Sequence, residues 1–161
     1  MDLNKREQLI DELSRQPEPQ LVLIERFFDG NDDEGSIGCN LLEHPGMDVF
    51  RDVLTGLLKR PDVKAAYAQI SELDPGDGCW PFADVVLVVG SIPLGELRAI
   101  SEVLQPSEVG IKQPPSPELR SMWQEFDRLA PIVGSAPETH DVLAVLQEKY
   151  PASSVCSLWW D

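Results

Sequence analysis

Residues 81–90 read Pro-Phe-Ala-Asp-Val-Val-Leu-Val-Val-Gly, and the rest of the predicted fold is arranged around this run. Its consecutive aliphatic side chains, mostly β-branched and bounded by Gly90, predict a buried central strand. Directly before it, residues 74–78 read Asp-Pro-Gly-Asp-Gly, which is strong turn chemistry. The apolar positions of residues 63–73 fit one face of a helix. They also fit a strand that pairs with residues 81–90 as a hairpin, and we favour the hairpin while the helix stays open.

Two amphipathic helices flank the hairpin along the chain. Residues 47–59 carry apolar side chains at helical spacing, and so do residues 94–104, which begin after Pro93. Apolar residues alternating with small or polar ones predict short strands at 36–42, 109–111 and 153–160. The order strand, helix, two strands, helix, strand is that of a ferredoxin-like βαββαβ sandwich. The predicted fold class is therefore α+β, with an antiparallel sheet and helices on one face.

The remaining segments are expected to decorate this core within a single domain. Residues 4–15 predict a helix that ends before Pro17, because proline cannot continue the hydrogen-bond ladder. The apolar run at 21–28 fits a short helix or a buried strand, and we favour the helix. After a proline-rich connector, further helices are expected at 117–129 and 138–149. The predicted organisation of residues 1–161 is an N-terminal helix within 1–19, a core at 20–112, a helical insert at 113–150 and a final strand at 153–161.

The charge balance of the chain is strongly acidic. Its 13 basic and 28 acidic residues give a formal net charge of −15. Such a charge opposes binding to nucleic-acid phosphates and to anionic membranes, and it attracts a basic protein partner. The three cysteines lack paired spacing, the N-terminus opens polar and no apolar run is long enough to span a bilayer. We therefore expect a cytoplasmic protein without a disulfide framework, and no cofactor is predicted.

The most densely polar segment is residues 27–40, which read Phe-Phe-Asp-Gly-Asn-Asp-Asp-Glu-Gly-Ser-Ile-Gly-Cys-Asn. Asp29, Asn31 and Asp33 alternate as the first ligands of a calcium-binding EF-hand loop do. The match then fails, because Glu34 stands where the loop requires glycine and the last position holds an amide instead of a bidentate glutamate. The segment is therefore not predicted to be an EF-hand.

A looser metal site remains an alternative prediction for this acidic segment. Asp29, Asp32 and Asp33 supply oxygen ligands of the kind that divalent cations prefer, in a binding site or in the centre of a metal-assisted hydrolase. A structural role is the competing interpretation, in which these side chains cap turns and helix ends. Nucleophilic catalysis has little support, because Ser36 lacks the spacing of a nucleophile elbow and Cys39 is expected to face the core.

The favoured functional hypothesis is binding without catalysis. An acidic face that engages a basic partner fits the net charge, and toxin-neutralising immunity proteins are one class of this kind. Alternation places Trp159 and Trp160 on opposite faces of the last strand, so one of them can serve as an interface anchor if it is exposed. The favoured alternative is that all four tryptophans of the chain pack in the core. The residues expected to contact the partner are Asp29, Asn31, Asp32, Asp33, Glu34 and Trp160.

Three segments together resemble a group of small bacterial proteins of unknown function. They are the acidic stretch 27–40, the Trp-Pro-Phe motif at 80–82 and the terminal Trp-Trp-Asp at 159–161. The resemblance covers residues 20–112 and the last strand, and it leaves out the insert at 113–150. It implies a bacterial cytosolic origin and a C-terminal strand that belongs to the sheet, and it carries no activity and no catalytic residue.

Overall fold

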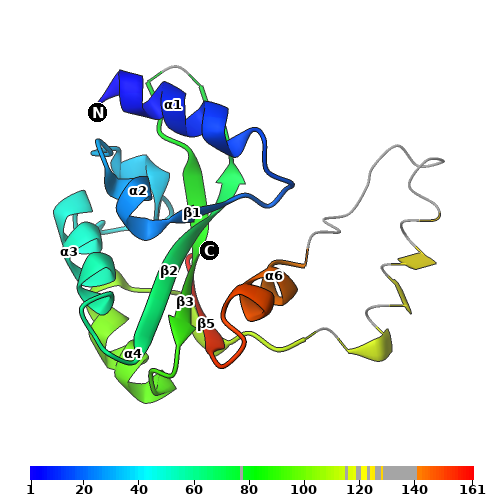
Figure 1. Ribbon diagram of the computed structural model, residues 1–161. Coiled ribbons are helices and arrows are strands. Elements are labelled where there is room, and N and C mark those ends of the chain that lie inside the picture. Colours follow the sequence, from blue (N-terminus) through cyan, green and yellow to red (C-terminus); the bar gives the residue numbers. More distant parts are fainter. Residues whose placement is uncertain (77, 115, 119–120, 123, 126–127, 129–140) are drawn as a thin grey trace.

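The computed structural model describes residues 1–76, 78–114, 116–118, 121–122, 124–125, 128 and 141–161 (Figure 1). Its strands are β1 (Leu21–Leu23), β2 (Val63–Glu72), β3 (Phe82–Gly90), β4 (Glu108–Ile111) and β5 (Ser154–Trp159). Its helices are α1 (Leu3–Leu13), α2 (Ile24–Phe28), α3 (Met47–Leu57), α4 (Leu94–Ser101) and α6 (Val142–Lys149), with 3-10 turns at Glu34–Ser36 and Glu102–Leu104. The predicted α+β class is confirmed.

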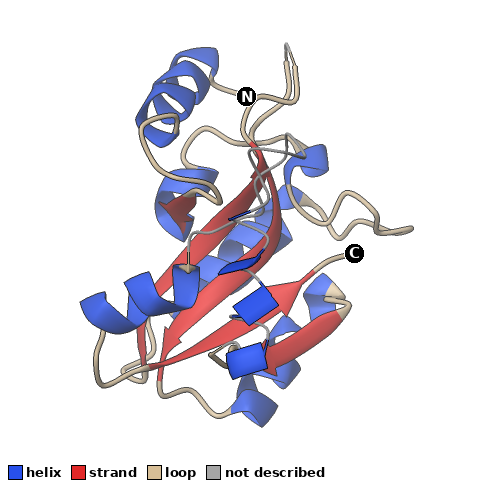
Figure 2. Cartoon of the chain, turned by 90° about the vertical axis from the view of Figure 1, so that its right-hand side faces the viewer, coloured by secondary structure: helices blue, strands red, loops and turns tan. Residues whose placement is uncertain are grey.

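The five strands form one sheet in the order β1-β2-β3-β5-β4, and every neighbouring pair is antiparallel. Figure 2 views this sheet from the side of α6. β2 and β3 form the expected hairpin, in which Tyr67 faces Leu87, so residues 63–72 are a strand rather than a helix. β5 lies on the other side of β3, where Cys156 faces Val88, so the C-terminal strand does belong to the sheet.

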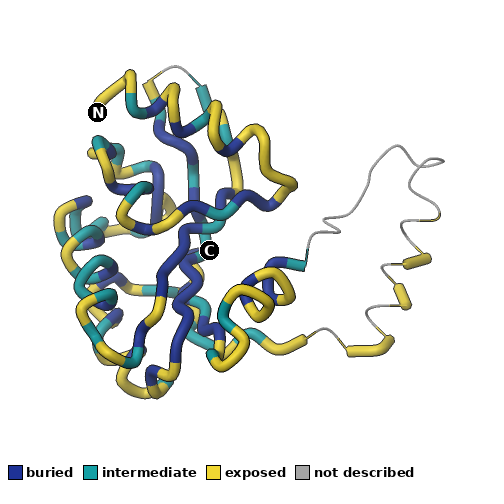
Figure 3. Tube along the Cα trace, viewed as in Figure 1, coloured by how far each residue is buried: buried dark blue, intermediate teal, exposed yellow. Residues whose placement is uncertain are grey.

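The larger hydrophobic core lies between the sheet and helices α1 to α4. Phe27 of α2, Phe50 of α3 and Leu97 of α4 are all fully buried there. Val86 and Val88 of β3 point into the same core, because alternate residues of a strand share one face of the sheet. Figure 3 shows the result, with buried strands at the centre and exposed residues on the outer sides of the helices.

A smaller core occupies the opposite face of the sheet, beneath α6. Leu143 and Leu146 of this helix pack with Leu87, Val89 and Val155, which are the β3 and β5 residues that alternate with the larger core. Each face of the central strand is thus covered by apolar side chains. This explains why the sequence of β3 reads as a continuous aliphatic run.

The ferredoxin-like arrangement is not confirmed, because helices cover both faces of the sheet and the expected first strand at 36–42 does not form. Ile37 makes only one isolated parallel bridge, to Ala83. The chain then turns at Gly38, whose φ of +64° leaves the extended region and whose carbonyl accepts a hydrogen bond from the Leu41 N–H at 3.0 Å. A Cβ at Gly38 would lie 2.9 Å from the Phe50 ring, so both the positive φ of the turn and its close packing against the core favour glycine at this position.

The remaining predictions of helices, at 21–28, 117–129 and 138–149, are each confirmed in part. The apolar run at 21–28 is both alternatives in succession, since the β1 strand passes directly into α2 at Ile24. Within the helix expected at 117–129, residues 117–118, 121–122, 124–125 and 128 are described and are helical, and the other positions lie outside the described part of the chain. The helix expected at 138–149 is described from Val142 onward as α6. None of the helices in the described ranges combines the length and apolarity needed to cross a membrane.

Arg6 attaches α1 to the turn of the β2–β3 hairpin. Its guanidinium donates to the Cys79 carbonyl, to the Gly76 carbonyl at 2.9 Å and to the Asp74 carboxylate at 2.5 Å. The side chain is almost fully buried, and a buried cation needs this many acceptors to offset its lost hydration. The N-terminal helix is therefore part of the domain core and not an appendage.

Candidate functional site

The acidic segment begins where α2 ends, close to the first residues of α1. Gly30 has a φ of +88°, and a Cβ at this position would lie 2.9 Å from the Cβ of Asp2. The Gly30 carbonyl accepts a hydrogen bond from the Asp2 N–H at 2.9 Å. Glycine is therefore required for this close approach of the two backbones.

Three side chains of the segment point inward and hold its shape; we call Asn31, Asp33 and Ser36 the inner set. Asn31 is only 1% exposed, and its Nδ2 donates to the Ser36 Oγ at 2.9 Å. Its Oδ1 accepts from the Asp33 N–H at 3.0 Å. Asp33 accepts with one oxygen from the Gly35 N–H at 2.9 Å and with the other from the Trp80 N–H at 2.8 Å. These bonds cap the 3-10 turn and attach the segment to the start of the hairpin's second strand.

Three acids of the segment point outward, and we call Asp29, Asp32 and Glu34 the outer set. Asp29 lies 2.5 Å from the Lys5 ammonium, whose hydrogen bond is the main reason that the pKa of Asp29 is held below its ordinary value. Asp32 lies 2.5 Å from the amino group of Met1, and that hydrogen bond lowers the pKa of Asp32. Glu34 is exposed and makes no ion pair or hydrogen bond within the described ranges.

A shallow depression of about 500 Å³ opens beside Asp29, between α2 and α3. The carboxylates of Glu25 and Asp52 flank it, and both side chains are exposed and without a partner among the described residues. Arg51 also lines the depression, but its guanidinium is engaged by Asp48 at 2.5 Å and by the Asn31 carbonyl at 2.9 Å. The depression therefore presents three carboxylates against one cation that already has acceptors. We call it the α2–α3 depression.

The carboxylates proposed as metal ligands do not converge. Asp29 faces Lys5, Asp32 faces the amino terminus, and Asp33 is used by two backbone amides. Within the described part of the chain, no three His, Cys, Asp or Glu side chains are grouped so as to hold a metal ion. The geometry thus lends no support to the metal-centred alternative.

The terminal tryptophans do lie on opposite faces, but the exposed one is Trp159. Trp160 is 4% exposed, its Nε1 donates to the Leu104 carbonyl at 2.7 Å, and its ring lies 5.4 Å from that of Phe50. Trp159 is 38% exposed on the face of the sheet that α6 partly covers, opposite Val85. Trp160 is therefore a core residue, and the structure does not bring it to the surface beside the acidic segment.

Sequence reasoning missed Glu25, Arg51 and Asp52, because it treated the acidic segment as a self-contained loop. The signal was present in the polar positions of the flanking helices, at 24–28 and 47–57. Which of these positions faces the loop depends on how α2 and α3 pack together, and the apolar pattern alone does not state that.

Comparison with known proteins places the chain in a family without an assigned activity. No curated protein and no solved structure matches it. The family described as "Uncharacterized protein YfbO family" matches residues 4–134, which include the acidic segment, the hairpin and β4. This agrees with the expected resemblance to an uncharacterised group. The matched region differs from the expected one, because it begins earlier, extends into the insert as far as residue 134 and does not include the last strand. Because the match covers most of the chain, the protein belongs to the uncharacterised YfbO family.

Proposed function

We propose that the protein is a non-enzymatic binding protein whose α2–α3 depression receives a basic side chain of a partner protein. The observation that carries this proposal is the exposure of Glu25 and Asp52, two unpaired carboxylates on either side of one depression. Most other acids near the segment are already engaged by the chain's own cations or amides, as Asp29 and Asp33 are.

Electrostatics support a basic partner in particular. The net charge of −15 produces a field that steers a cationic protein toward the surface and raises its association rate. A lysine or arginine that enters the depression finds two carboxylates whose charge has not been neutralised. The specific role that we propose for this surface is the neutralisation of a basic toxin, which is what immunity proteins do.

Two candidates for a base or nucleophile, His44 and Cys156, have structural environments, whereas Cys39, which was expected to face the core, is exposed. Both ring nitrogens of His44 are in contact with backbone groups, Nδ1 with the Gly46 N–H and Nε2 with the Ile37 carbonyl, each at 3.0 Å. Burial raises the pKa of the Cys156 thiol, which disfavours the reactive thiolate. His44 thus has a structural use, and Cys156 has the environment of an inert core residue.

The decisive experiment is a pull-down from the native cytoplasm with three forms of the full-length protein. The wild type should retain a basic protein at low salt and lose it steeply as salt rises, because exposed charges are screened. The double variant Glu25→Gln/Asp52→Asn should lose most of this protein. The matched control Glu72→Gln/Glu148→Gln removes the same charge from two exposed acids elsewhere and should retain it.

Two results would count against the proposal. Equal retention by the wild type and the Glu25→Gln/Asp52→Asn variant shows that the depression is not the binding surface. Equal loss in the two double variants shows that only total charge matters and that no particular site exists.

A further inference from the structure

β4 is the last strand of the sheet, and no strand of the described residues pairs with its outer edge. The Lys112 N–H donates to the Val155 carbonyl at 2.8 Å, so residues of even number in this strand direct their backbone groups toward β5. Val109 and Ile111 must then direct their N–H and C=O groups outward. Apart from the Arg98 guanidinium, which donates to the Val109 carbonyl at 3.2 Å, no described residue occupies these outward groups.

The residues along this edge can pair with the same residues of a second copy that runs antiparallel to it. Residues 108–112 read Glu-Val-Gly-Ile-Lys. In an antiparallel pair of two such strands centred on Gly110, Val109 lies opposite Ile111 of the second copy, and Glu108 lies opposite Lys112 of the second copy. Within the described part of the chain, neither Glu108 nor Lys112 has an ion-pair partner. Opposite charges at facing positions stabilise a pair of strands, and like charges destabilise it.

The hydrogen-bond pattern fits the same register. Facing residues that both direct their backbone groups across the interface exchange two hydrogen bonds, and Val109 and Ile111 are the residues that do so. Their side chains share the face of the larger core, where Val109 already packs and Ile111 is 49% exposed. Pairing therefore satisfies the open backbone groups and covers an exposed isoleucine in one step.

We propose that two copies of this chain associate through β4, in antiparallel register centred on Gly110, so that their two sheets form one continuous sheet. This interface is independent of the α2–α3 depression and of the function proposed for it.

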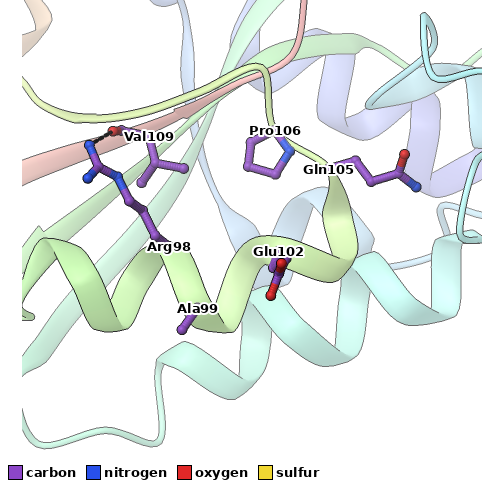
Figure 4. A pocket seen from close by; sticks show the side chains of 6 residues that line it. All are labelled: Arg98, Ala99, Glu102, Gln105, Pro106 and Val109. Atoms are coloured by element: carbon purple, nitrogen blue, oxygen red, sulfur yellow. Dashed lines mark hydrogen bonds between the residues drawn. The ribbon is translucent and has the colours of Figure 1, made fainter.

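The surface beside the edge is compatible with a second copy. A pocket of about 500 Å³ lies between α4 and β4, lined by Arg98, Glu102, Gln105 and Val109 among others (Figure 4). The incoming strand replaces Arg98 at the Val109 carbonyl, which accepts only this one side-chain hydrogen bond among the described residues.

The opposite edge of the sheet does not offer a comparable surface, so the association ends at two copies. β1 has three residues, and its outward Leu21 N–H is occupied by the Gln16 Oε1 at 3.2 Å. The strand follows Pro19 and passes directly into α2. Short strands, proline and side-chain capping are the means by which sheet edges avoid pairing.

Net charge opposes the association, and this gives it a characteristic salt response. Each copy carries −15, so two copies repel at low ionic strength. Moderate salt screens this long-range repulsion and should raise the dimer fraction, which is the reverse of the salt response expected for a basic partner.

A charge-swap experiment on the full-length chain tests the interface by analytical ultracentrifugation across concentration. The wild type should show a reversible monomer–dimer equilibrium. Lys112→Glu and Glu108→Lys each place like charges opposite one another at two symmetric positions and should weaken the dimer by about tenfold. The double variant Glu108→Lys/Lys112→Glu should restore it. An equimolar mixture of the two single variants should form a heterodimer, since its facing pairs are again opposite in charge.

Two controls keep the result specific. Lys59→Glu changes the net charge as Lys112→Glu does, at an exposed position on the α3 side, and should leave the wild-type equilibrium nearly unchanged. Hydrogen exchange at the amides of Val109 and Ile111 should slow as protein concentration rises. A chain that stays monomeric at all concentrations and salts overturns the proposal, and so does a dimer that neither single variant weakens or that the double variant fails to restore.

Discussion

The inner and outer sets of the acidic segment both contain aspartate, but their side chains have different partners and different roles. Asn31, Asp33 and Ser36 bond to one another and to backbone amides, whereas Asp29 pairs with the Lys5 ammonium and Asp32 pairs with the Met1 amino group. Within the eight residues 29–36, some polar side chains therefore hold the local structure and others carry surface charge. The difference shows that the number of acids in a segment says little about its role until the donors around each carboxylate are known.

Replacing Asp33 with alanine should give the largest loss of stability. The Trp80 N–H lies at a fully buried residue and would lose its acceptor, as would the Gly35 N–H. We expect the free energy of unfolding to fall by about 2–3 kcal/mol, measured by chemical denaturation. Asp33→Asn retains one acceptor oxygen and should fall between the wild type and Asp33→Ala. A loss no larger than that from Asp29→Ala would erase the distinction between the two sets.

Asn31→Ala should give the next largest effect. The change removes the acceptor of the Asp33 N–H and the donor to the Ser36 hydroxyl, both in the interior of the segment. The expected decrease in the free energy of unfolding is about 1–2 kcal/mol. The double variant Asn31→Ala/Asp33→Ala should lose less than the sum of the single losses, because the two side chains share one network. Strict additivity would mean that the inner set does not act as a unit.

Asp29→Asn should have a smaller effect that depends on pH. Because the folded-state pKa of Asp29 lies below its ordinary value, its pairing with Lys5 stabilises the fold above the unfolded-state pKa. That contribution is lost as the pH falls through the folded-state value. Acid unfolding curves of Asp29→Asn should therefore be less steep than those of the wild type. Glu25→Gln, which removes an unpartnered acid nearby, serves as the matched control and should keep the wild-type steepness.

Glu25→Gln/Asp52→Asn should have the smallest effect on stability. Neither carboxylate has a partner to lose within the described residues, so the midpoint of chemical unfolding should stay at the wild-type value or rise slightly. A clear decrease in this midpoint would show that the two acids serve the fold, and it would remove the structural basis for assigning them to a partner.

Much of the sheet could be predicted from local pattern. The aliphatic run of β3 and the Asp-Pro-Gly turn before it indicated the hairpin, and both are confirmed. The strand predicted at 36–42 was wrong because alternation was read through Gly38, where a positive φ turns the chain. At 21–28 the strand was the less favoured of the two alternatives, because a run of apolar residues does not reveal where a strand becomes a helix.

The candidate site was harder to predict than the fold, because its partners are distant in sequence. One carboxylate oxygen of Asp33 accepts a hydrogen bond from the Trp80 amide, which lies 47 residues away, and no local pattern around Asp33 indicates this donor. Strand alternation correctly separated Trp159 from Trp160, but only the position of α3 and of the 3-10 turn after α4 shows which of the two is buried.

The link between Asp33 and the Trp80 amide also has a kinetic consequence. It joins segments 47 residues apart, and contacts of long sequence separation form only after the intervening chain is organised. We therefore expect the acidic segment to become ordered late, once the β2–β3 hairpin has docked. A partly folded chain then carries the same carboxylates as the native protein without their fixed arrangement, so the order of the acidic segment should report on the completion of folding.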